Sequence, residues 1–467
     1  MKRFWLVLLS LGLVMAFSAS AFAVDVKVSG SYYVAGVYLD KIGLNEETAA
    51  DEGQSTAFYF QRLRVGTELV VSPGLSLVTR FDAMERVWGA RNIVGVVSNQ
   101  PNSAGTVAEN ENMAWDYAYV KYATPIGTFL VGAMPGGTFG TVFNNSEEPR
   151  YRIKYVSPDY SGFSWTATIE KNKENSYNNQ IGNLISNYST NADADTDTYY
   201  LSADYKAKNW AVGILYGYQI DKSKTANPNA ANLDLNNLIK YGDPWYALDG
   251  SKATAHSFNP YFTAVFGPVK LQGEMKYIVG EVEYPGSTIA DKDINSFGAY
   301  LDAVGTFGPV YVGGTFAYAQ GDVDSTDDEV NNSVNGGMDW SPTLIMWNED
   351  RARWIGTITS SAVGTNNAFD TTFGNAYLFQ LRVGVKPVEK LDVCFSGTYA
   401  MRDKTPNNFD DELGWEFDLT GTYKITNNLS YMLGAGYLIT GDYFKGANQA
   451  SEVENNYMII NKLALTF

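Results

Sequence analysis

One pattern repeats along almost the whole chain: segments that alternate apolar and polar residues, joined in turn by a tight connection and by a long one. Successive side chains on a strand point to opposite faces, so each segment predicts a strand with one apolar and one polar face. We expect about eighteen strands, with sixteen as the alternative. They cover residues 26–38, 57–71, 75–88, 113–123, 128–134, 150–156, 163–171, 197–206, 210–220, 254–266, 269–279, 294–307, 310–320, 373–386, 391–402, 413–425, 429–440 and 456–467.

The two kinds of connection are sorted along the chain. Tight turns rich in Gly, Pro and Asn, such as Ser72-Pro73-Gly74 and Gly308-Pro309, follow the even-numbered strands. Long connections follow odd-numbered strands and include 39–56, 89–112 and 321–372. This sorting predicts an all-β fold, a transmembrane antiparallel up-and-down β-barrel with short periplasmic turns and long external loops. A soluble sandwich or propeller has no reason to sort its connections in this way.

The first 23 residues have the pattern of an export signal. Lys2 and Arg3 precede an apolar run, and Ala21-Phe22-Ala23 supplies a small-residue cleavage site. We therefore expect residues 1–23 to be a signal peptide and residues 24–467 to be a single barrel domain. Beyond residue 23 the sequence has no apolar stretch near the ~20 residues that a spanning helix needs. A membrane protein with this sequence must then be a closed barrel.

Composition excludes some functions. Without Lys2 and Arg3 the chain has 32 basic and 51 acidic residues, a formal charge of −19, which argues against a nucleic-acid partner. The single cysteine, Cys394, forms no internal disulfide, and its position among polar residues predicts a small wall residue. The single histidine, His256, adjoins Ser257, but neighbours on a strand point to opposite faces and form no nucleophile and base pair. We expect no enzyme, no catalytic residue, no cofactor and no metal centre.

The polar faces of several strands carry charge. A charged side chain facing lipid costs roughly 2–4 kcal/mol near the bilayer midplane, so these faces must look inward. They then enclose water, and we expect them to line a pore. The inward charged residues singled out in this way are Arg62, Arg64, Arg80, Asp82, Arg150, Arg152 and Lys154.

Residues 135–149 form an unusual third long loop. The segment is rich in glycine and contains Phe139 and Phe143, followed by the acidic pair Glu147 and Glu148. We expect the loop to fold into the lumen, with the two phenylalanines packed on the wall and the carboxylates facing the inward arginines. Such a transverse field would select small polar solutes by charge. An ordinary external hairpin loop is the alternative.

The end of the chain is itself a strand pattern. In residues 457–467, apolar and aromatic side chains from Tyr457 to Phe467 share one face, while Lys462 lies on the other. We expect this strand to pair with residues 26–38 and close the barrel. Tyr457 and the terminal Phe467 are the predicted assembly signal.

The chain resembles trimeric general porins of the Gram-negative outer membrane. The resemblance lies in Asp116-Tyr-Ala-Tyr-Val120, in Gly127-Thr-Phe-Leu-Val-Gly132 with the glycine-rich loop after it, and in residues 457–467. Repeated Phe-Gly-Pro turns and the strand count are most similar to porins of sulfate-reducing deltaproteobacteria. The resemblance implies a homotrimer in outer-membrane lipid and lipopolysaccharide, inserted by the barrel-assembly machinery and passing small hydrophilic solutes. One departure is Ala133, where many members have arginine.

Other functions fit the same barrel. A substrate-specific channel for sugars or amino acids is the main alternative to a passive channel for ions and small hydrophilic solutes. The barrel would also suit the sheath of a porin-cytochrome electron conduit, an adhesin or a structural barrel. The acidic run from Asp322 to Glu329 fits loose calcium binding. Ion selectivity stays open, because acidic loops attract cations whereas inward arginines attract anions.

Overall fold

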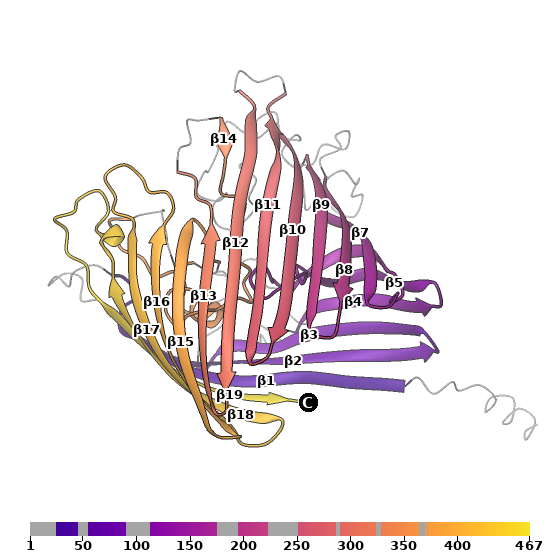
Figure 1. The fold of residues 1–467 in the computed structure, drawn as a ribbon, viewed down its shortest axis with the longest axis horizontal. Coiled ribbons are helices and arrows are strands. Elements are labelled where there is room, and N and C mark those ends of the chain that lie inside the picture. The colour runs from indigo at the N-terminus through magenta and orange to yellow at the C-terminus, as the bar shows by residue number, and fades with distance from the viewer. Residues whose placement is uncertain are drawn as a thin grey trace, which may run out of the picture.

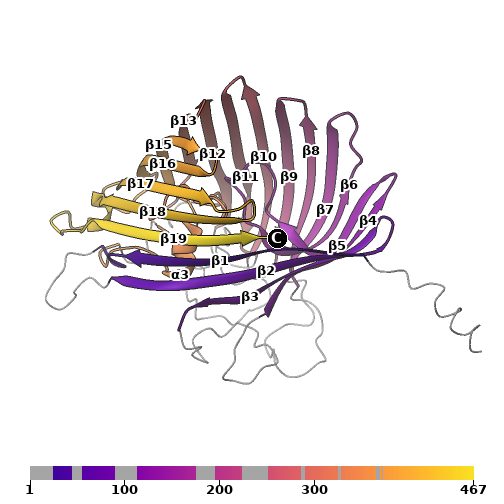
Figure 2. The ribbon, with the colours of Figure 1, turned by 90° about the horizontal axis from the view of Figure 1, so that it is seen from below.

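The computed structural model describes residues 25–44, 55–89, 113–174, 195–222, 251–285, 290–323, 328–363, 369–370 and 372–467. Its strands form one sheet that closes on itself (Figures 1 and 2). The spanning strands are β1 (Asp25–Leu39), β2 (Thr56–Ser72), β3 (Leu75–Val87), β4 (Met113–Thr124), β5 (Gly127–Gly136), β6 (Glu148–Val156), β7 (Phe163–Lys173), β8 (Thr196–Lys206), β9 (Trp210–Asp221), β10 (Lys252–Phe266), β11 (Val269–Glu283), β12 (Lys292–Phe307), β13 (Val310–Ala319), β15 (Ala376–Val388), β16 (Leu391–Arg402), β17 (Glu412–Lys424), β18 (Leu429–Thr440) and β19 (Asn456–Thr466).

The predicted closed antiparallel barrel of eighteen strands is confirmed, and the alternative of sixteen is wrong. Each spanning strand overlaps the expected segment. The largest difference at a strand end is at β11, which continues to Glu283 rather than ending at residue 279. The sequence pattern did not predict β14 (Glu329–Val330), a two-residue strand parallel to β12. It also missed helix α3 (Glu349–Trp354) and the short helix η2 (Asp442–Lys445).

The barrel closes between β1 and β19. Ser31 lies opposite Thr466 and Leu39 lies opposite Met458, so the register runs along most of both strands. Gly30 and Phe467 exchange two backbone hydrogen bonds of 2.8 and 3.0 Å. Because every spanning strand then has two neighbours, no strand edge of the wall is left unpaired.

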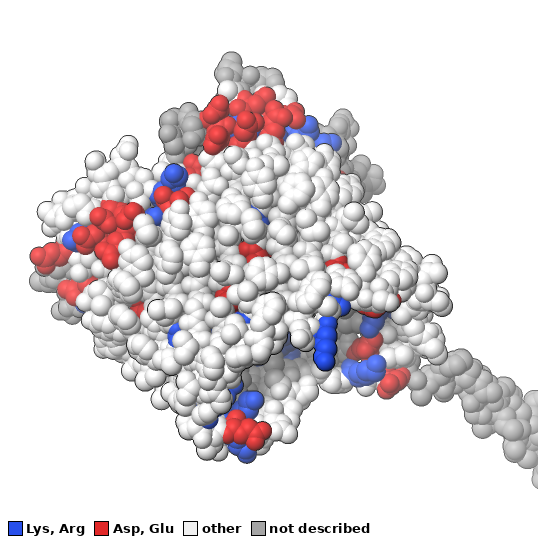
Figure 3. Space-filling view, in the orientation of Figure 1, with Lys and Arg blue, Asp and Glu red and all other residues white. Residues whose placement is uncertain are grey.

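The outer face of the wall is apolar over a broad band. Figure 3 shows this band over the strands that face the viewer, with acidic residues gathered at the end above β11 and β12. Leu381, on β15, has 74% of its surface exposed, as expected for a side chain that points away from the barrel. Other exposed apolar residues on the spanning strands include Val120, Val131, Ile153, Ile169, Leu201, Ile214, Met275, Leu301, Val312, Leu419, Leu433, Ile459 and Leu463.

Two residues singled out by their rarity have ordinary positions in this wall. His256 accompanies outward-facing tyrosines: its Nδ1 lies 2.8 Å from the Tyr216 hydroxyl, and its ring stacks on Tyr218. Ser257 points to the other face and lines a lumenal cavity. Cys394 is partly buried on the inner face of β16. Among the described residues, no helix is both long and apolar enough to cross a bilayer.

Two connections fill much of the lumen. The first, which we call the inner loop, comprises residues 137–147 between β5 and β6. The second, which we call the plug, comprises the described residues of 331–375 between β14 and β15. Figure 2 shows α3, which belongs to the plug, lying within the ring of strands beside β1 and β2.

The position of the plug corrects the expectation that residues 321–372 form an external loop. Trp340 and the run Leu344–Trp347 are almost completely buried and belong to the main apolar core. The wall supplies the other half of that core through inward apolar side chains. These are Tyr33, Ala35, Val37 and Leu39 of β1, Met458 and Ile460 of β19, and small or aliphatic residues such as Ala317, Ala319, Ala376, Leu378, Ala400, Leu413 and Leu438.

Helix α3 begins at a capped end inside the plug. The side chain of Asn348 accepts a hydrogen bond of 3.0 Å from the backbone amide of Arg351. Glu349 and Asp350 occupy the first turn, where negative charge favours a helix. Asp350 also fixes the helix to the wall, because its carboxylate accepts a 2.6 Å hydrogen bond from the inward Lys462 of β19.

Candidate pore constriction

The inner loop crosses the lumen and packs on the opposite wall. Phe143 is completely buried and stacks on Tyr300 of β12, with ring centroids 5.1 Å apart and ring planes 3° from parallel. Phe139 meets Tyr261 of β10 edge to face at 5.2 Å. Stacked and edge-to-face pairs of this kind add to the apolar area that is buried. The two phenylalanines therefore hold the loop across the barrel.

A carboxylate on the far wall fixes the backbone of the loop. Glu274 of β11 accepts hydrogen bonds from the Thr141 amide at 2.7 Å, the Thr141 hydroxyl at 2.6 Å and the Asn144 amide group at 2.6 Å. Gly140 is positioned for this contact with a φ of +88°, and a Cβ there would lie 2.8 Å from a Glu274 oxygen. Glycine is the residue that adopts this backbone conformation without strain next to another group.

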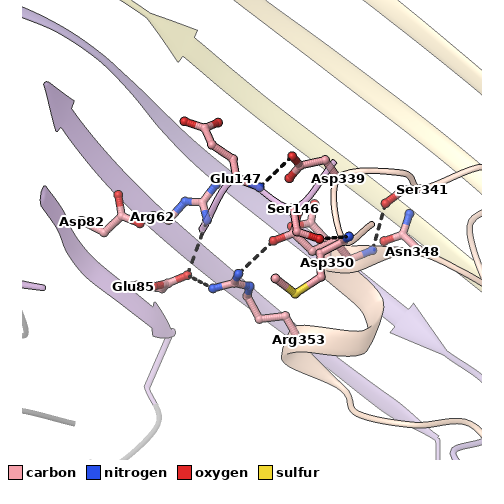
Figure 4. A network of polar contacts seen from close by, with 12 residues as sticks. Arg62, Asp82, Glu85, Ser146, Glu147, Asp339, Ser341, Asn348, Asp350 and Arg353 are labelled. Atoms are coloured by element: carbon pink, nitrogen blue, oxygen red, sulfur yellow. Dashed lines mark hydrogen bonds and ion pairs between the residues drawn. The ribbon is translucent and has the colours of Figure 1, made fainter. Parts of the chain in front are cut away.

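The inner loop and the plug touch in the middle of the lumen. The Gly337 amide donates to the Phe143 carbonyl at 2.6 Å, and the Asp339 amide donates to the Asn145 carbonyl at 3.0 Å. In the other direction, the Glu147 amide donates to the Asp339 carboxylate at 3.1 Å (Figure 4). The two insertions thus form one bar, which we call the lumenal bar, between the walls.

The arginines of β2 and β3 face carboxylates at close range. Arg64 makes two 2.7 Å hydrogen bonds to Asp82, in the side-by-side geometry that favours an Arg and carboxylate pair. Arg80 donates to Asp116 at 3.0 Å and to Glu147 of the inner loop at 2.6 Å. The positive charge expected at this part of the wall is therefore matched by negative charge.

A second set of ion pairs joins β2 and β3 to the plug (Figure 4). Glu85 of β3 lies 3.7 Å from Arg62 and accepts a 3.0 Å hydrogen bond from Arg353 of α3. Arg353 also donates to Glu349 at 2.9 Å. The side chains of β2, β3 and α3 thus form a second polar network beside the one that includes the inner loop.

The basic residues of β6 have different surroundings. Arg150 pairs with Glu148, and Arg152 pairs with Glu170 of β7 and donates to the Pro135 carbonyl at 3.0 Å. Lys154 is partly buried and forms no ion pair or hydrogen bond with any described residue. The ion pair of Glu148 is therefore with a neighbour on its own strand and not with an arginine of β2 or β3.

Two adjoining cavities follow the inner face of β6 to β11, on one side of the lumenal bar. Their volumes are about 510 and 340 Å³. The larger extends toward the long-connection ends of β7 and β8, where Lys173 and Thr196 lie, and the smaller extends toward the short turns, where Asp204 lies. Seven residues line both: Gly137, Asn144, Arg152, Thr198, Tyr200, Gln219 and Lys276. We call the two cavities together the β6–β11 passage and the seven shared residues its neck.

A third cavity lies on the other side of the bar, against β2 to β4. It has a volume of about 280 Å³, and we call it the β2–β4 pocket. Its lining includes Arg62, Arg64, Arg80 and Arg353, together with the carboxylates that form ion pairs with them. Among the described residues, Glu148 is the only one that it shares with the lining of the β6–β11 passage.

Buried polar groups hold the plug against the wall. One oxygen of Glu416 on β17 accepts the amides of Leu344 and Ile345 at 2.9 and 2.6 Å, and the other accepts that of Met346 at 2.8 Å. Within the plug, the Arg351 guanidinium donates to the carbonyls of Met346 at 2.8 Å and Gly356 at 2.6 Å. Burial lowers the pKa of Arg351 to about 10, so this guanidinium stays charged at neutral pH.

The structure divides the residues that the sequence singled out. Arg62, Arg64, Arg80, Asp82 and Glu147 meet in the β2–β4 pocket. Phe139, Arg150, Arg152 and Lys154 line the β6–β11 passage, Glu148 lines both spaces, and Phe143 is buried in the core. At the barrel seam, the hydroxyl of the outward Tyr457 lies 3.4 Å from that of Tyr38, and Phe467 packs over Gly30.

Other residues of the site were not singled out. Glu274 and Lys276 lie on the inner face of a strand that was expected, and their charge at alternate positions was the available signal. Asp116 was noted only as part of the resemblance to porins. Of the acidic run, Asp324 and Asp327 lie outside the described residues, as does the expected signal peptide.

Comparison with known proteins identifies the fold. No protein-family model matches the chain, and no curated protein matches it. Among solved structures it is similar to OccK9 (OpdG) of Pseudomonas aeruginosa, with 13% identity, a TM-score of 0.51 and coverage of 95% of this chain and 99% of that one. It is also similar to OccK8 (OprE) of the same organism, with 12% identity, a TM-score of 0.50 and coverage of 94% and 98%. At this identity the likeness establishes the barrel fold.

Proposed function

We propose that this chain is an outer-membrane channel for the passive diffusion of ions and small hydrophilic solutes. The observation that carries the proposal is the β6–β11 passage, a polar space inside a closed barrel whose outer wall is apolar. An apolar exterior around a polar interior is the arrangement of a barrel that holds water within a bilayer.

The ends of the strands support a position in a membrane. Exposed aromatic side chains lie where strands meet the short turns, among them Trp210, Phe266 and Phe307, and Phe467 lies at the same end of the barrel. Aromatic residues at such positions favour the boundary between lipid and water. Their place at strand ends therefore agrees with a bilayer around the middle of the wall.

Planar-bilayer recording tests the proposal. Purified full-length protein is added to a lipid bilayer in potassium chloride, and we expect stepwise currents that rise linearly with voltage. Current blocked by a low concentration of one sugar or amino acid would favour a substrate-specific channel instead. Protein that inserts, as shown by its heat-modifiable mobility in gels, but carries no current would contradict a channel and favour a structural or adhesive barrel.

The assembly state remains a prediction from the resemblance to general porins, as does the narrower similarity to porins of sulfate-reducing deltaproteobacteria. Native mass measurement of the detergent-solubilised protein tests the expected homotrimer. A mass of one chain with bound detergent would contradict it. Contacts with lipopolysaccharide and with the assembly machinery are proposals on the same basis.

A further inference from the structure

We propose that solutes cross the barrel through the β6–β11 passage and that the ammonium groups of Lys154 and Lys276 give this passage a preference for anions. Of the arginines that the sequence placed at the pore, Arg80 of β3 fastens the lumenal bar to the wall, whereas Arg62 and Arg64 of β2 pair with carboxylates of the wall itself. This inference rests on the proposed channel function and names its route and the class of ion it favours.

The first support is the continuity of the passage. Its two cavities extend toward opposite ends of the barrel and meet at the neck, where Thr198, Tyr200 and Lys276 line both. A space that runs past the inner loop in this way connects the two halves of the lumen. The β2–β4 pocket is separate from this passage, and among the described residues it shares only Glu148 with it.

The second support is charge without a close partner. Lys154 and Lys276 both line the 340 Å³ cavity, and within the described part of the chain neither forms an ion pair or a hydrogen bond. The carboxylates that act on them, Asp204 and Glu274, bind the Tyr261 hydroxyl at 2.7 Å and the inner loop instead of forming an ion pair with either lysine. Two amines that face a narrow polar space attract anions into it.

The third support is that the basic residues of the β2–β4 pocket, unlike the two lysines, are paired with carboxylates. Its four arginines face seven carboxylates, and Arg62, Arg64, Arg80 and Arg353 each lie within ion-pair distance of at least one of them. Two of these contacts, from Arg80 to the inner loop and from Arg353 to β3, bridge parts of the chain that are far apart in sequence. Arginines used in this way position the bar and leave little positive charge for a passing ion.

Cysteine modification tests the route. In a Cys394→Ser background, Thr198→Cys places a thiol in the neck and Ala114→Cys places one in the β2–β4 pocket as the matched control. A negatively charged methanethiosulfonate reagent is added to open channels in a bilayer. We expect the current of Thr198→Cys to fall by roughly half or more, because a bulky group in the neck obstructs the passage, and that of Ala114→Cys to stay nearly constant. A fall at Ala114→Cys without one at Thr198→Cys would overturn the inferred route.

Reversal potentials in a potassium chloride gradient test the selectivity. We expect the anion-to-cation permeability ratio of the wild type to exceed one and to fall about threefold in Lys276→Gln and Lys154→Gln, since each variant removes a unit charge close to the ion. Lys386→Gln is the control, because Lys386 lies on the inner wall outside both spaces. Heat-modifiable mobility shows that each variant is folded.

The outcomes separate this inference from the function it rests on. A wild type that inserts without current contradicts the channel itself. A conducting wild type that prefers cations, or whose permeability ratio is unchanged in both lysine variants, contradicts only the role of the lysines. An anion-to-cation permeability ratio that falls in Arg64→Gln but in neither lysine variant would show that the arginines of the β2–β4 pocket determine the selectivity.

Discussion

Single residues decide how the lumen is filled. Glu416 satisfies three consecutive backbone amides of the plug, Glu274 satisfies the inner loop, and Arg351 satisfies carbonyls within the plug. Irregular backbone is tolerated inside a barrel only where such partners exist, because a buried amide without a partner is costly. The same chemistry explains why acidic side chains lie on the inner face of β11 and β17.

At this scale we predict that Glu416→Ala loosens the plug. The change leaves the amides of Leu344, Ile345 and Met346 without their hydrogen-bond acceptor. A buried group left without its partner lowers the free energy of unfolding by roughly 1–3 kcal/mol. Hydrogen exchange followed by mass spectrometry should show faster exchange in peptides that contain residues 344–346. Glu389→Ala, in an exposed turn, is the control. Unchanged exchange in the plug would mean that Glu416 does not hold it.

At the scale of elements, the inner loop and the plug stabilise one another. The loop inserts Phe143 between Tyr300 of the wall and Trp340 of the plug, and the backbones of loop and plug share hydrogen bonds. A change in the core of one should therefore be detected in the other. The strands around them supply small inward residues, such as Ala317 and Ala376, that leave room for these side chains.

We predict that Phe143→Ala weakens both insertions while the barrel remains closed. Removing a buried phenylalanine costs roughly 3–5 kcal/mol, and here the cost falls on the contact between loop, plug and wall. Single-channel recordings should show a noisier current than the wild type. Phe139→Ala should have the smaller effect, because the Phe139 ring is only partly buried and meets the single ring of Tyr261. Equal and quiet currents in both variants would show that the stacking on Tyr300 does not hold the loop.

The strands were predictable from the sequence, whereas the plug was not. Alternation with a period of two is imposed by the wall itself, so β1 to β13 and β15 to β19 left a pattern in the residues. The plug follows no period, and its position depends on contacts with strands far away in the chain. Its apolar run, Leu344–Trp347, and the inward Met458 and Ile460 were the available signals. Neither signal predicts a plug by itself, because an inner face that contacts water and one that contacts a plug have the same period of two.

The pore residues show the same limit. The alternation of side chains along each strand correctly predicts that Arg64, Arg80 and Lys154 point inward, because a charged side chain that faces lipid is excluded by its free-energy cost. It does not predict which charges meet. Asp82, Asp116 and Glu147 pair with the arginines through side-chain geometry across three elements, whereas Lys154 has no such partner among the described residues.

At the scale of the whole molecule, closure depends on the seam between β1 and β19. Phe467 makes two backbone hydrogen bonds with Gly30 and packs its ring over it on the outer face. We predict that Phe467→Ala lowers the yield of folded protein in the outer membrane, because it removes the ring that packs over Gly30 at the seam. The measurement is the heat-modifiable fraction in membrane extracts, with Phe307→Ala, an exposed aromatic at another turn, as control. Equal yields for both variants and the wild type would contradict that role.

The measurement that tests the central claim most directly is solute flux into liposomes. Vesicles that contain the purified protein are diluted into isosmotic solutions of small hydrophilic solutes of increasing size, and swelling is followed by light scattering. A passive channel predicts rapid swelling with the smallest neutral solutes and a graded decline with size. Inserted and folded protein that gives no more swelling than empty vesicles, for any solute tested, would contradict it.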